Sequence, residues 1–270
     1  MIDNKPSSFK YLCGLSIKKF HVLFDVTIPY LHAIEYQDSK GTGIRALDKR
    51  NELFSVLTIC HHALHLGVMA HMLLVSESTV NRLFVVWIVF LETFDKVDLH
   101  PDDGYLFKRM LEIFFKTGHG LTDMIIYCTE FKFQQTTNFH LNTLIDIYPG
   151  SISDSAITEK TGVLSWLTPE HKLMADGDFA VQDYCLIKGV YLNSLAQKNL
   201  NKFSHGDVST NFDIASTRIH VEQFIGRVRE WLILNTVWPM QRLDLLSSTW
   251  KTMCHIVNLT MDPIGPNSEK

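Results

Sequence analysis

The sequence has few cysteines, and they do not form a recognisable pattern. Its five cysteines are spread along the chain without any Cys-x-x-Cys pair: Cys13, Cys60, Cys128, Cys185 and Cys254. An odd number without close pairs argues against a disulfide framework and against a thiolate zinc site. We therefore expect a protein of a reducing compartment, in the nucleus or the cytoplasm.

An excess of positive charge is also lacking. The 270 residues include 25 lysines and arginines against 29 acidic residues, for a net charge of −4. A chain of this balance has no overall basic field of the kind that dominates nonspecific nucleic-acid binding. Any contact with DNA must therefore come from a local patch of side chains.

Long apolar runs are missing too. The longest, from Leu83 to Leu91, has nine residues, whereas a bilayer requires roughly 20. The first residues show no apolar run followed by small residues, so we expect neither a secretory signal nor a membrane partner. With 46% hydrophobic residues, the composition instead predicts a globular protein with one or two cores.

The first half of the chain carries helical patterns. A short helical lead-in is predicted from Phe9 to about Gly43, and a strongly helical region from Asn51 to Val97. Gly67 and the segment Val75–Ser78 interrupt the second pattern, which predicts a helix, a short helix, a turn and a long helix. Ser76 or Ser78 is expected to cap the long helix.

After a further predicted helix at 105–116, the pattern changes to α/β. The predicted strands are Met124–Phe133, Leu141–Tyr148, Lys172–Ala175 and an extended Val190–Leu195, and the predicted helices are Val181–Lys188 and Ile214–Leu234. One face of the last helix carries an apolar stripe, made up of Val221, Phe224, Ile225, Val228 and Leu232.

Two carboxylates in this region are candidate metal ligands. Asp176 follows the short strand at 172–175, and Glu222 lies on the flank of the helical stripe between Arg218 and Arg229. A strand-borne and a helix-borne acid are what two-metal phosphoryl chemistry uses. Spacing alone favours a different interpretation of Glu222, a surface ion-pair ladder with the two arginines.

Five sequence blocks favour the metal site over the ion-pair ladder, because together they resemble the DDE superfamily endonucleases of Harbinger-like transposases. The blocks follow the family order and read VSESTVNR (75–82), IIYCTE (125–130), DIYPGSISD (146–154), MADGDF (174–179) and IASTRIHVEQFIGR (214–227). The resemblance extends from about Phe9 to Leu259.

The resemblance implies an α+β protein. A helix-turn-helix DNA-binding region at 51–120 would follow a helical lead-in at 1–50, and a reduced ribonuclease-H-like domain with a mixed sheet would occupy 121–262, before a tail at 263–270. The family's acidic triad binds a divalent metal cation, Mg²⁺ or Mn²⁺, for DNA cleavage. Asp176 matches the second acid and Glu222 the third, so both are expected catalytic and metal-binding residues.

Two departures from the family bear on activity. Tyr127 stands where the family has its first aspartate, and a neutral phenol cannot replace a carboxylate that bridges two cations. Glu130 cannot replace it, because three residues along a strand reverse the side-chain direction. The segment Gln134–His140 is also too short for one central strand of the family. We therefore expect weakened metal binding and a catalytically impaired nuclease.

Two functions remain as hypotheses. The first is an impaired transposase-derived DDE endonuclease, with DNA and a separate DNA-binding protein as partners. The alternative is a non-catalytic, domesticated DNA-binding or protein-interaction scaffold. In either case, the predicted DNA contacts are Ser78, Thr79, Asn81 and Arg82, whose types suit phosphates and base edges. The helix-spaced pair His61 and His65 is a weaker candidate for zinc, without the glutamate of a His-Glu-x-x-His motif.

Overall fold

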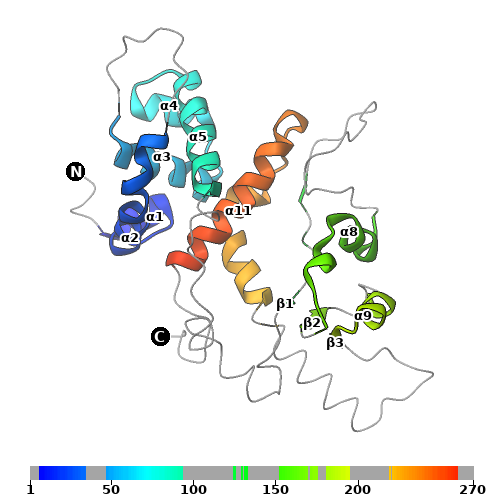
Figure 1. The fold of residues 1–270 in the computed structure, drawn as a ribbon. Coiled ribbons are helices and arrows are strands. Elements are labelled where there is room, and N and C mark those ends of the chain that lie inside the picture. The colour runs from blue at the N-terminus through cyan, green and yellow to red at the C-terminus, as the bar shows by residue number, and fades with distance from the viewer. Residues whose placement is uncertain are drawn as a thin grey trace. The chain divides into compact units, whose positions relative to one another are not determined.

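The protein consists of two compact units, seen in a computed structural model (Figure 1). The model describes residues 6–34, 47–93, 124–125, 129, 131–132, 152–169, 171–175, 181–194, 219 and 221–260. The first of the two units, which we call the helical unit, is made up of residues 1–100, 131–143 and 225–262. The second, the sheet unit, is made up of residues 101–130, 144–224 and 263–270.

The helical unit begins with the helices that the sequence predicts. In chain order these are α1 (Pro6–Cys13), α2 (Ile17–Thr27), the 3₁₀ helix η1 (Ile28–Ala33), α3 (Lys49–His62), α4 (Leu66–Leu73) and α5 (Glu77–Glu92). Side-chain caps start several of them: Ser16 accepts from Lys19 N–H in α2, and Asp48 accepts from Asn51 N–H in α3. The predicted order of helix, short helix, turn and long helix is confirmed.

One predicted break lies at a different residue. Gly67 was expected to interrupt the helical pattern, but it lies in the first turn of α4. The chain instead turns at Ala63, whose φ of 50° is left-handed, and α4 begins after His65. The His65 imidazole nitrogen Nδ1 accepts from Gly67 N–H at 3.1 Å. A histidine cap carries no simple sequence signature, whereas glycine is an obvious candidate breaker.

The last helix of the chain, α11 (Leu243–Thr260), completes the helical unit. It follows two 3₁₀ helices, η5 (Leu232–Asn235) and η6 (Met240–Arg242), and packs against α5 and α2. Its buried face includes Leu246, Met253 and Ile256, and the fully buried Trp87 comes from α5. Each such side chain stabilises the fold by roughly 1.5–3 kcal/mol through removal from water. Helices far apart in sequence therefore share one core.

Among its described residues, the sheet unit has three short parallel strands. They are β1 (Met124–Ile125), β2 (Lys172–Ala175) and β3 (Tyr191–Ser194), paired in the order β1-β2-β3. The connections include α8 (Asp154–Thr161), the 3₁₀ helix η3 (Val163–Trp166) and α9 (Gln182–Lys188). Parallel neighbours require such crossover connections. The predictions for 172–175, 181–188 and 190–195 are confirmed, and with them the α+β class.

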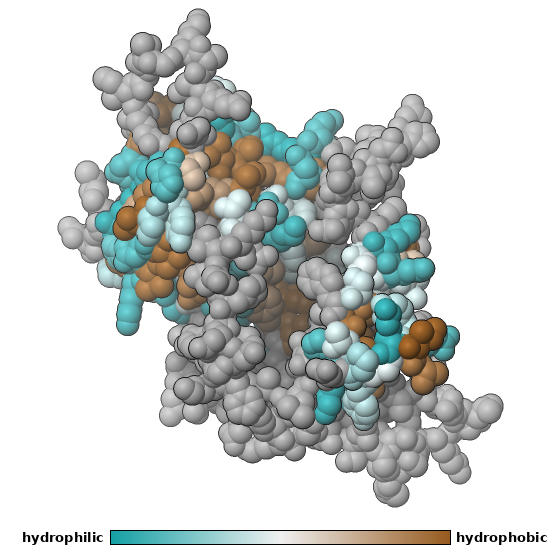
Figure 2. Space-filling view, viewed as in Figure 1, coloured by the Kyte–Doolittle hydropathy of each residue, from teal (hydrophilic) through white to brown (hydrophobic). Residues whose placement is uncertain are grey.

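The exposed side of α9 carries two large aliphatic side chains among polar ones. Leu186 and Ile187 are each 82% exposed, and Tyr191 at the start of β3 is 61% exposed. In Figure 2, a brown group of residues lies over α9. Large aliphatic side chains are usually buried, so two adjacent ones that are both exposed to solvent on one helix are unusual.

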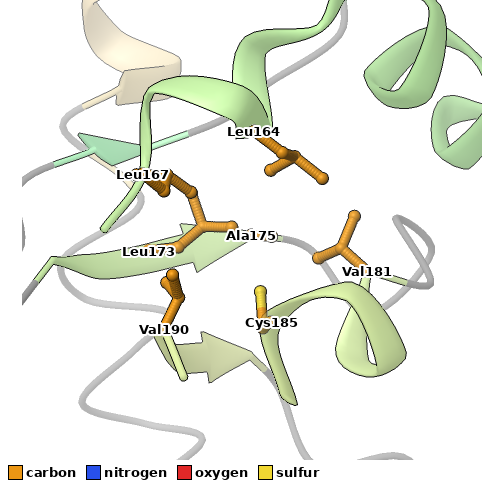
Figure 3. Packing of buried hydrophobic residues seen from close by; sticks show 7 residues of the cluster. All are labelled: Leu164, Leu167, Leu173, Ala175, Val181, Cys185 and Val190. Carbon is orange, nitrogen blue, oxygen red and sulfur yellow. The ribbon is translucent and has the colours of Figure 1, made fainter. Parts of the chain in front are cut away.

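Beneath α9, the sheet unit has its own small core. Leu173 and Ala175 lie on the same face of β2, because alternate residues of a strand share a face. Figure 3 shows the residues that surround them, from η3, α9 and the adjoining turns: Leu164, Leu167, Val181, Cys185 and Val190. This packing holds β2 in place, and Asp176 is the next residue along the chain.

The predicted long helix at 214–234 is shorter than expected at its C-terminal end. Residues 221–229 are helical, and Val228 is fully buried. Trp231 has extended backbone angles, and η5 begins at Leu232, which is 48% exposed. Leu232 is therefore not part of the buried stripe, because the helical periodicity ends before it. The predicted helix at 105–116 and the predicted strand at 141–148 lie outside the described residues.

Among the described residues, no single helix is long and apolar enough to cross a membrane. The pair α4 and α5 passes that test only when the two are taken together, and their axes differ by 109°.

Candidate functional site

The turn between α4 and α5 has the proportions of a helix-turn-helix. α4 ends at Leu73, and α5 starts at Glu77 after a connection formed by Leu74, Val75 and Ser76. The two helices are bent by 109° at this break. Helix-turn-helix motifs place two helices at about 90–120° across a turn of about three to four residues. Leu74 makes the sharp turn in the left-handed region, with a φ of 56°.

Ser76 organises the first turn of α5. Its hydroxyl oxygen accepts from Thr79 N–H at 3.2 Å and lies 2.8 Å from the hydroxyl oxygens of both Ser78 and Thr79. Ser76, and not Ser78, is therefore the N-cap. Ser78 is exposed and Thr79 half-buried, so both predicted DNA contacts are hydroxyls that this cap already orients.

The next two predicted contacts differ in their surroundings. Arg82 is exposed, whereas Asn81 is half-buried. The guanidinium group of Arg242 donates a hydrogen bond to the side-chain oxygen Oδ1 of Asn81. Ser78 and Arg82 are four residues apart and share one face of the helix. The exposed polar face of α5 thus begins with Ser78 and Arg82.

Polar contacts also join α11 to the later turns of α5. The Thr252 hydroxyl donates to the carbonyl oxygen of Ile88 at 3.1 Å, in a buried position. Lys251 Nζ lies 3.3 Å from the Glu92 carboxylate. With the Arg242 bond to Asn81, α5 is held at its second, third and last turns by η6 and α11. The candidate recognition helix is therefore fixed by a segment about 160 residues later in the chain.

The two candidate acids cannot be compared by distance. Glu222 is exposed on the helix 221–229, whereas Asp176, like Tyr127, Glu130 and Asp178, lies outside the described residues. The expected approach of Asp176 to Glu222 is therefore still a prediction. Within the described part of the chain, no three His, Cys, Asp or Glu side chains are grouped as a metal site.

The proposed ion-pair ladder around Glu222 is only partly described. Arg218 lies outside the described residues, and the Arg229 guanidinium lies over the Phe131 ring at 5.7 Å from its centroid. A cation over an aromatic face is held there by the ring quadrupole. Arg229 therefore has an aromatic partner, which the spacing argument did not include.

The histidines have structural partners. His61 lies in the last turn of α3 and His65 caps α4, with the left-handed Ala63 between them, so the two do not share a helix face as the zinc hypothesis required. The His61 ring packs edge-on against Trp231, with centroids 5.6 Å apart. His62 Nε2 lies 2.7 Å from the Tyr11 carbonyl oxygen. Burial, and secondly the charge of His62, lower the pKa of His61 below its ordinary 6.5.

Arg242 was not among the residues that the sequence singled out. It lies in η6, between Pro239 and the start of α11, and no periodic pattern or motif surrounds it. Only its contact with Asn81, 161 residues away in the chain, marks it as part of this surface.

Comparison with known proteins finds one similarity, to a family of endonucleases. Residues 126–258 match the DDE superfamily endonuclease family. No curated protein and no solved structure matches the chain significantly. The matched segment includes β2, β3 and α11, and so contributes to both units. Residues 126–258 of this chain are therefore similar to a transposase-type DDE endonuclease domain.

Proposed function

We propose that this protein is a transposase-derived, DDE endonuclease-like protein that binds DNA through α4 and α5 and has lost metal-dependent DNA cleavage. The observation that carries the DNA-binding half is the helix-turn-helix geometry of α4 and α5, with Ser78 and Arg82 presented on the exposed face of α5. DNA is the substrate that the endonuclease family implies. We expect the protein to act in the nucleus.

The proposed binding mode follows from the chemistry of α5. A recognition helix places the residues of its first turns toward the major groove. The Arg82 guanidinium suits a phosphate or a guanine edge, and the Ser78 hydroxyl suits a phosphate. Basic residues outnumber acidic ones among the described parts of the helical unit, although the whole chain is acidic. This local excess of positive charge favours the binding of DNA to the helical unit.

The residues present do not fit the two-cation cofactor of the family. DDE endonucleases generally use divalent cations, which the acidic triad would hold. Asp176 and Glu222 supply two of the three acids, and Tyr127 occupies the position of the first. An ordinary phenol, with a pKa near 10, stays neutral at physiological pH. Two carboxylates suit one weakly held Mg²⁺ or Mn²⁺, but a second cation lacks its bridging ligand.

The strand order supports the assignment of these positions to one family site, within a reduced ribonuclease-H-like sheet. β1 and β2 are parallel neighbours, so their carboxyl ends lie at the same edge of the sheet. Tyr127 is the second residue after β1, and Asp176 is the first after β2. In open α/β sheets, ligands bind outside the carboxyl ends of the strands.

Binding of a short mixed-sequence DNA duplex tests the first half of the proposal. We expect Arg82→Met to weaken binding and to reduce the dependence of log K on log salt concentration by about one unit, because one phosphate contact is lost. Lys18→Met, the same charge change on an exposed residue of α2, is the control. Wild-type protein without salt-dependent binding would refute the DNA-binding role.

Nicking of supercoiled plasmid with Mg²⁺ or Mn²⁺ tests the second half. We expect no cleavage by the wild-type protein, and cleavage by Tyr127→Asp if the rest of the centre is intact. The double variant Tyr127→Asp with Asp176→Ala should again be inactive. Wild-type cleavage that Asp176→Ala abolishes would contradict the proposal, because another acid, such as Asp178 or Asp154, would then have replaced the first aspartate.

A protein-interaction scaffold is the second candidate. The exposed Leu186 and Ile187 on α9 favour it, because adjacent aliphatic side chains at a surface are typical of contact sites. A separate DNA-binding protein is the partner that we expect for such a site. If Tyr127→Asp restores no cleavage and the wild-type protein binds no DNA, this alternative replaces the first proposal.

A further inference from the structure

We propose that Arg242 is a further DNA-contacting residue, and that Asn81 acts by positioning Arg242 and not by reading a base. This inference rests on the proposed DNA-binding function of α5. It assigns part of the DNA-binding surface to the segment matched by the endonuclease family, which sequence reasoning placed in a separate domain.

The contact between the two side chains carries the proposal. Arg242 donates from Nη2 to Oδ1 of Asn81, on the second turn of α5. Asparagine reads adenine by using its carbonyl oxygen and its amide nitrogen together. In Asn81 the carbonyl oxygen already accepts from Arg242, which uses one of its two lone pairs and orients the amide toward Arg242.

Arg242 is also held in place from its own side. Its backbone N–H donates to the Pro239 carbonyl oxygen at 3.0 Å. The residue that follows, Leu243, is buried, and Leu246 one turn later is fully buried in the core. Because Thr252 and Lys251 fasten α11 to the later turns of α5, the backbone that carries Arg242 cannot move away from α5 without disturbing that packing.

The chemistry of the side chain suits a phosphate. A guanidinium carries several N–H donors in a rigid plane, and the bond to Asn81 engages one nitrogen. Arg242 is half-buried, and its partner Asn81 is the chain neighbour of the exposed Arg82. A neutral amide partner fixes the orientation of Arg242 without neutralising its charge, which a carboxylate would do. The charge is therefore retained for an anionic ligand.

Substitutions at Arg242 separate a DNA contact from a structural role. Arg242→Gln keeps an amide donor for Asn81 but removes the charge, and Arg242→Lys keeps the charge. Binding of the mixed-sequence duplex by the full chain is measured across salt concentrations, and thermal unfolding is measured for every variant. We expect Arg242→Gln to weaken binding severalfold and to reduce the salt dependence by about one unit. Arg242→Lys should restore most of the salt dependence, with an unchanged unfolding temperature.

Asn81→Ala completes the experiment. If Asn81 positions Arg242, Asn81→Ala should weaken binding in the wild-type background and have little further effect in Arg242→Gln. Unchanged binding and salt dependence in Arg242→Gln would overturn the proposal, as would fully additive effects of the two substitutions. The proposal would also be overturned if Arg242→Gln weakened DNA binding only as much as the Lys18→Met control does, because such a loss would reflect the change in net charge alone.

The same measurements distinguish the two proposals. If Arg82→Met weakens binding and Arg242→Gln does not, only the assignment of Arg242 fails. If neither variant changes the salt dependence, the DNA-binding role of α5 fails with it.

Discussion

Gly14 is a residue whose identity the fold requires for two reasons. It follows α1 with a φ of +78°, where its N–H donates to the Lys10 carbonyl oxygen. A Cβ atom at this position would lie 2.9 Å from His61 Nδ1 and 3.3 Å from the Trp231 ring. The left-handed conformation costs other residues about 1–2 kcal/mol, and overpacking typically adds about 1–3 kcal/mol.

We therefore predict that Gly14→Ala lowers the free energy of unfolding by about 2–4 kcal/mol. Gly162→Ala is the matched control, because Gly162 has a similar φ of +64° but its nearest neighbouring atom is 4.0 Å away. It should cost only the conformational part, about 1–2 kcal/mol. Chemical denaturation measures both. Equal losses would mean that the contact with His61 contributes nothing.

His61 should make the stability of the helical unit depend on pH. Its folded-state pKa is lowered below 6.5, first by burial and then by His62. The unfolded state therefore binds the proton more readily, so the stabilisation is present above pH 6.5 and declines as pH falls below it, toward the lowered folded value.

Denaturation between about pH 7.5 and 5.5 checks this, since the window brackets the ordinary histidine pKa. We expect His61→Gln to flatten the decline relative to wild type. His32→Gln, which changes an exposed histidine, should leave it unaltered. A wild-type stability that is constant across this range would contradict the prediction.

At the scale of elements, α5 depends on its N-cap. The Ser76 hydroxyl satisfies Thr79 N–H, one of the free donors at the start of the helix. We predict that Ser76→Ala lowers the free energy of unfolding by about 1 kcal/mol. Ser78→Ala, which removes a hydroxyl that contacts the Ser76 hydroxyl, should cost less. A larger loss for Ser78→Ala in thermal denaturation would assign the cap to the other serine.

α11 contributes to the helical unit as much as the N-terminal helices do. It packs on α5 and α2 and buries Leu246 and Met253 completely. Leu246→Ala should lower the free energy of unfolding by about 2–5 kcal/mol, because it leaves a cavity in a packed core. Asp244→Ala, on the exposed side of the same helix, should change it by less than about 0.5 kcal/mol.

At the scale of the whole molecule, the helical unit is discontinuous in sequence. Its residues come from both ends of the chain and from 131–143 between them. Phe131 packs on Trp250, with ring centroids 5.3 Å apart, and Trp238 N–H donates to the Lys132 carbonyl oxygen at 2.9 Å. Residues 131–132 therefore lie in one unit with α5 and α11, which come from distant parts of the chain.

A fragment of residues 1–93 tests this arrangement. Without α11, the apolar face of α5 would be exposed to water, so we predict that the fragment does not unfold cooperatively. Circular dichroism during heating measures this, with the full chain as reference. A sharp transition in the fragment would show that the N-terminal helices form a core without α11.

Local patterns were sufficient for most of the element assignments. The helices 49–62, 66–73 and 77–92 and the strands 172–175 and 191–194 follow from apolar spacing and from turn residues, which act over a few neighbouring positions. The family was also recognisable from short blocks, including MADGDF at 174–179. In contrast, the cap at His65 and the helix end before Leu232 depend on side-chain and backbone geometry that periodicity does not encode.

The sequence by itself determined the order of the elements at 49–92 and 172–194, the α+β class and the resemblance to the endonuclease family, because these depend on residue types and short-range spacing. The helices at 154–161 and 243–260 were not among the predicted elements. Only the tertiary structure decided that α11 packs against α5 and that Arg242 holds Asn81. Both contacts join residues about 160 positions apart, and they depend on the packing of complementary helix faces. No local pattern specifies which two helix faces pack together, because the burial of any apolar stripe stabilises the fold by a similar free energy.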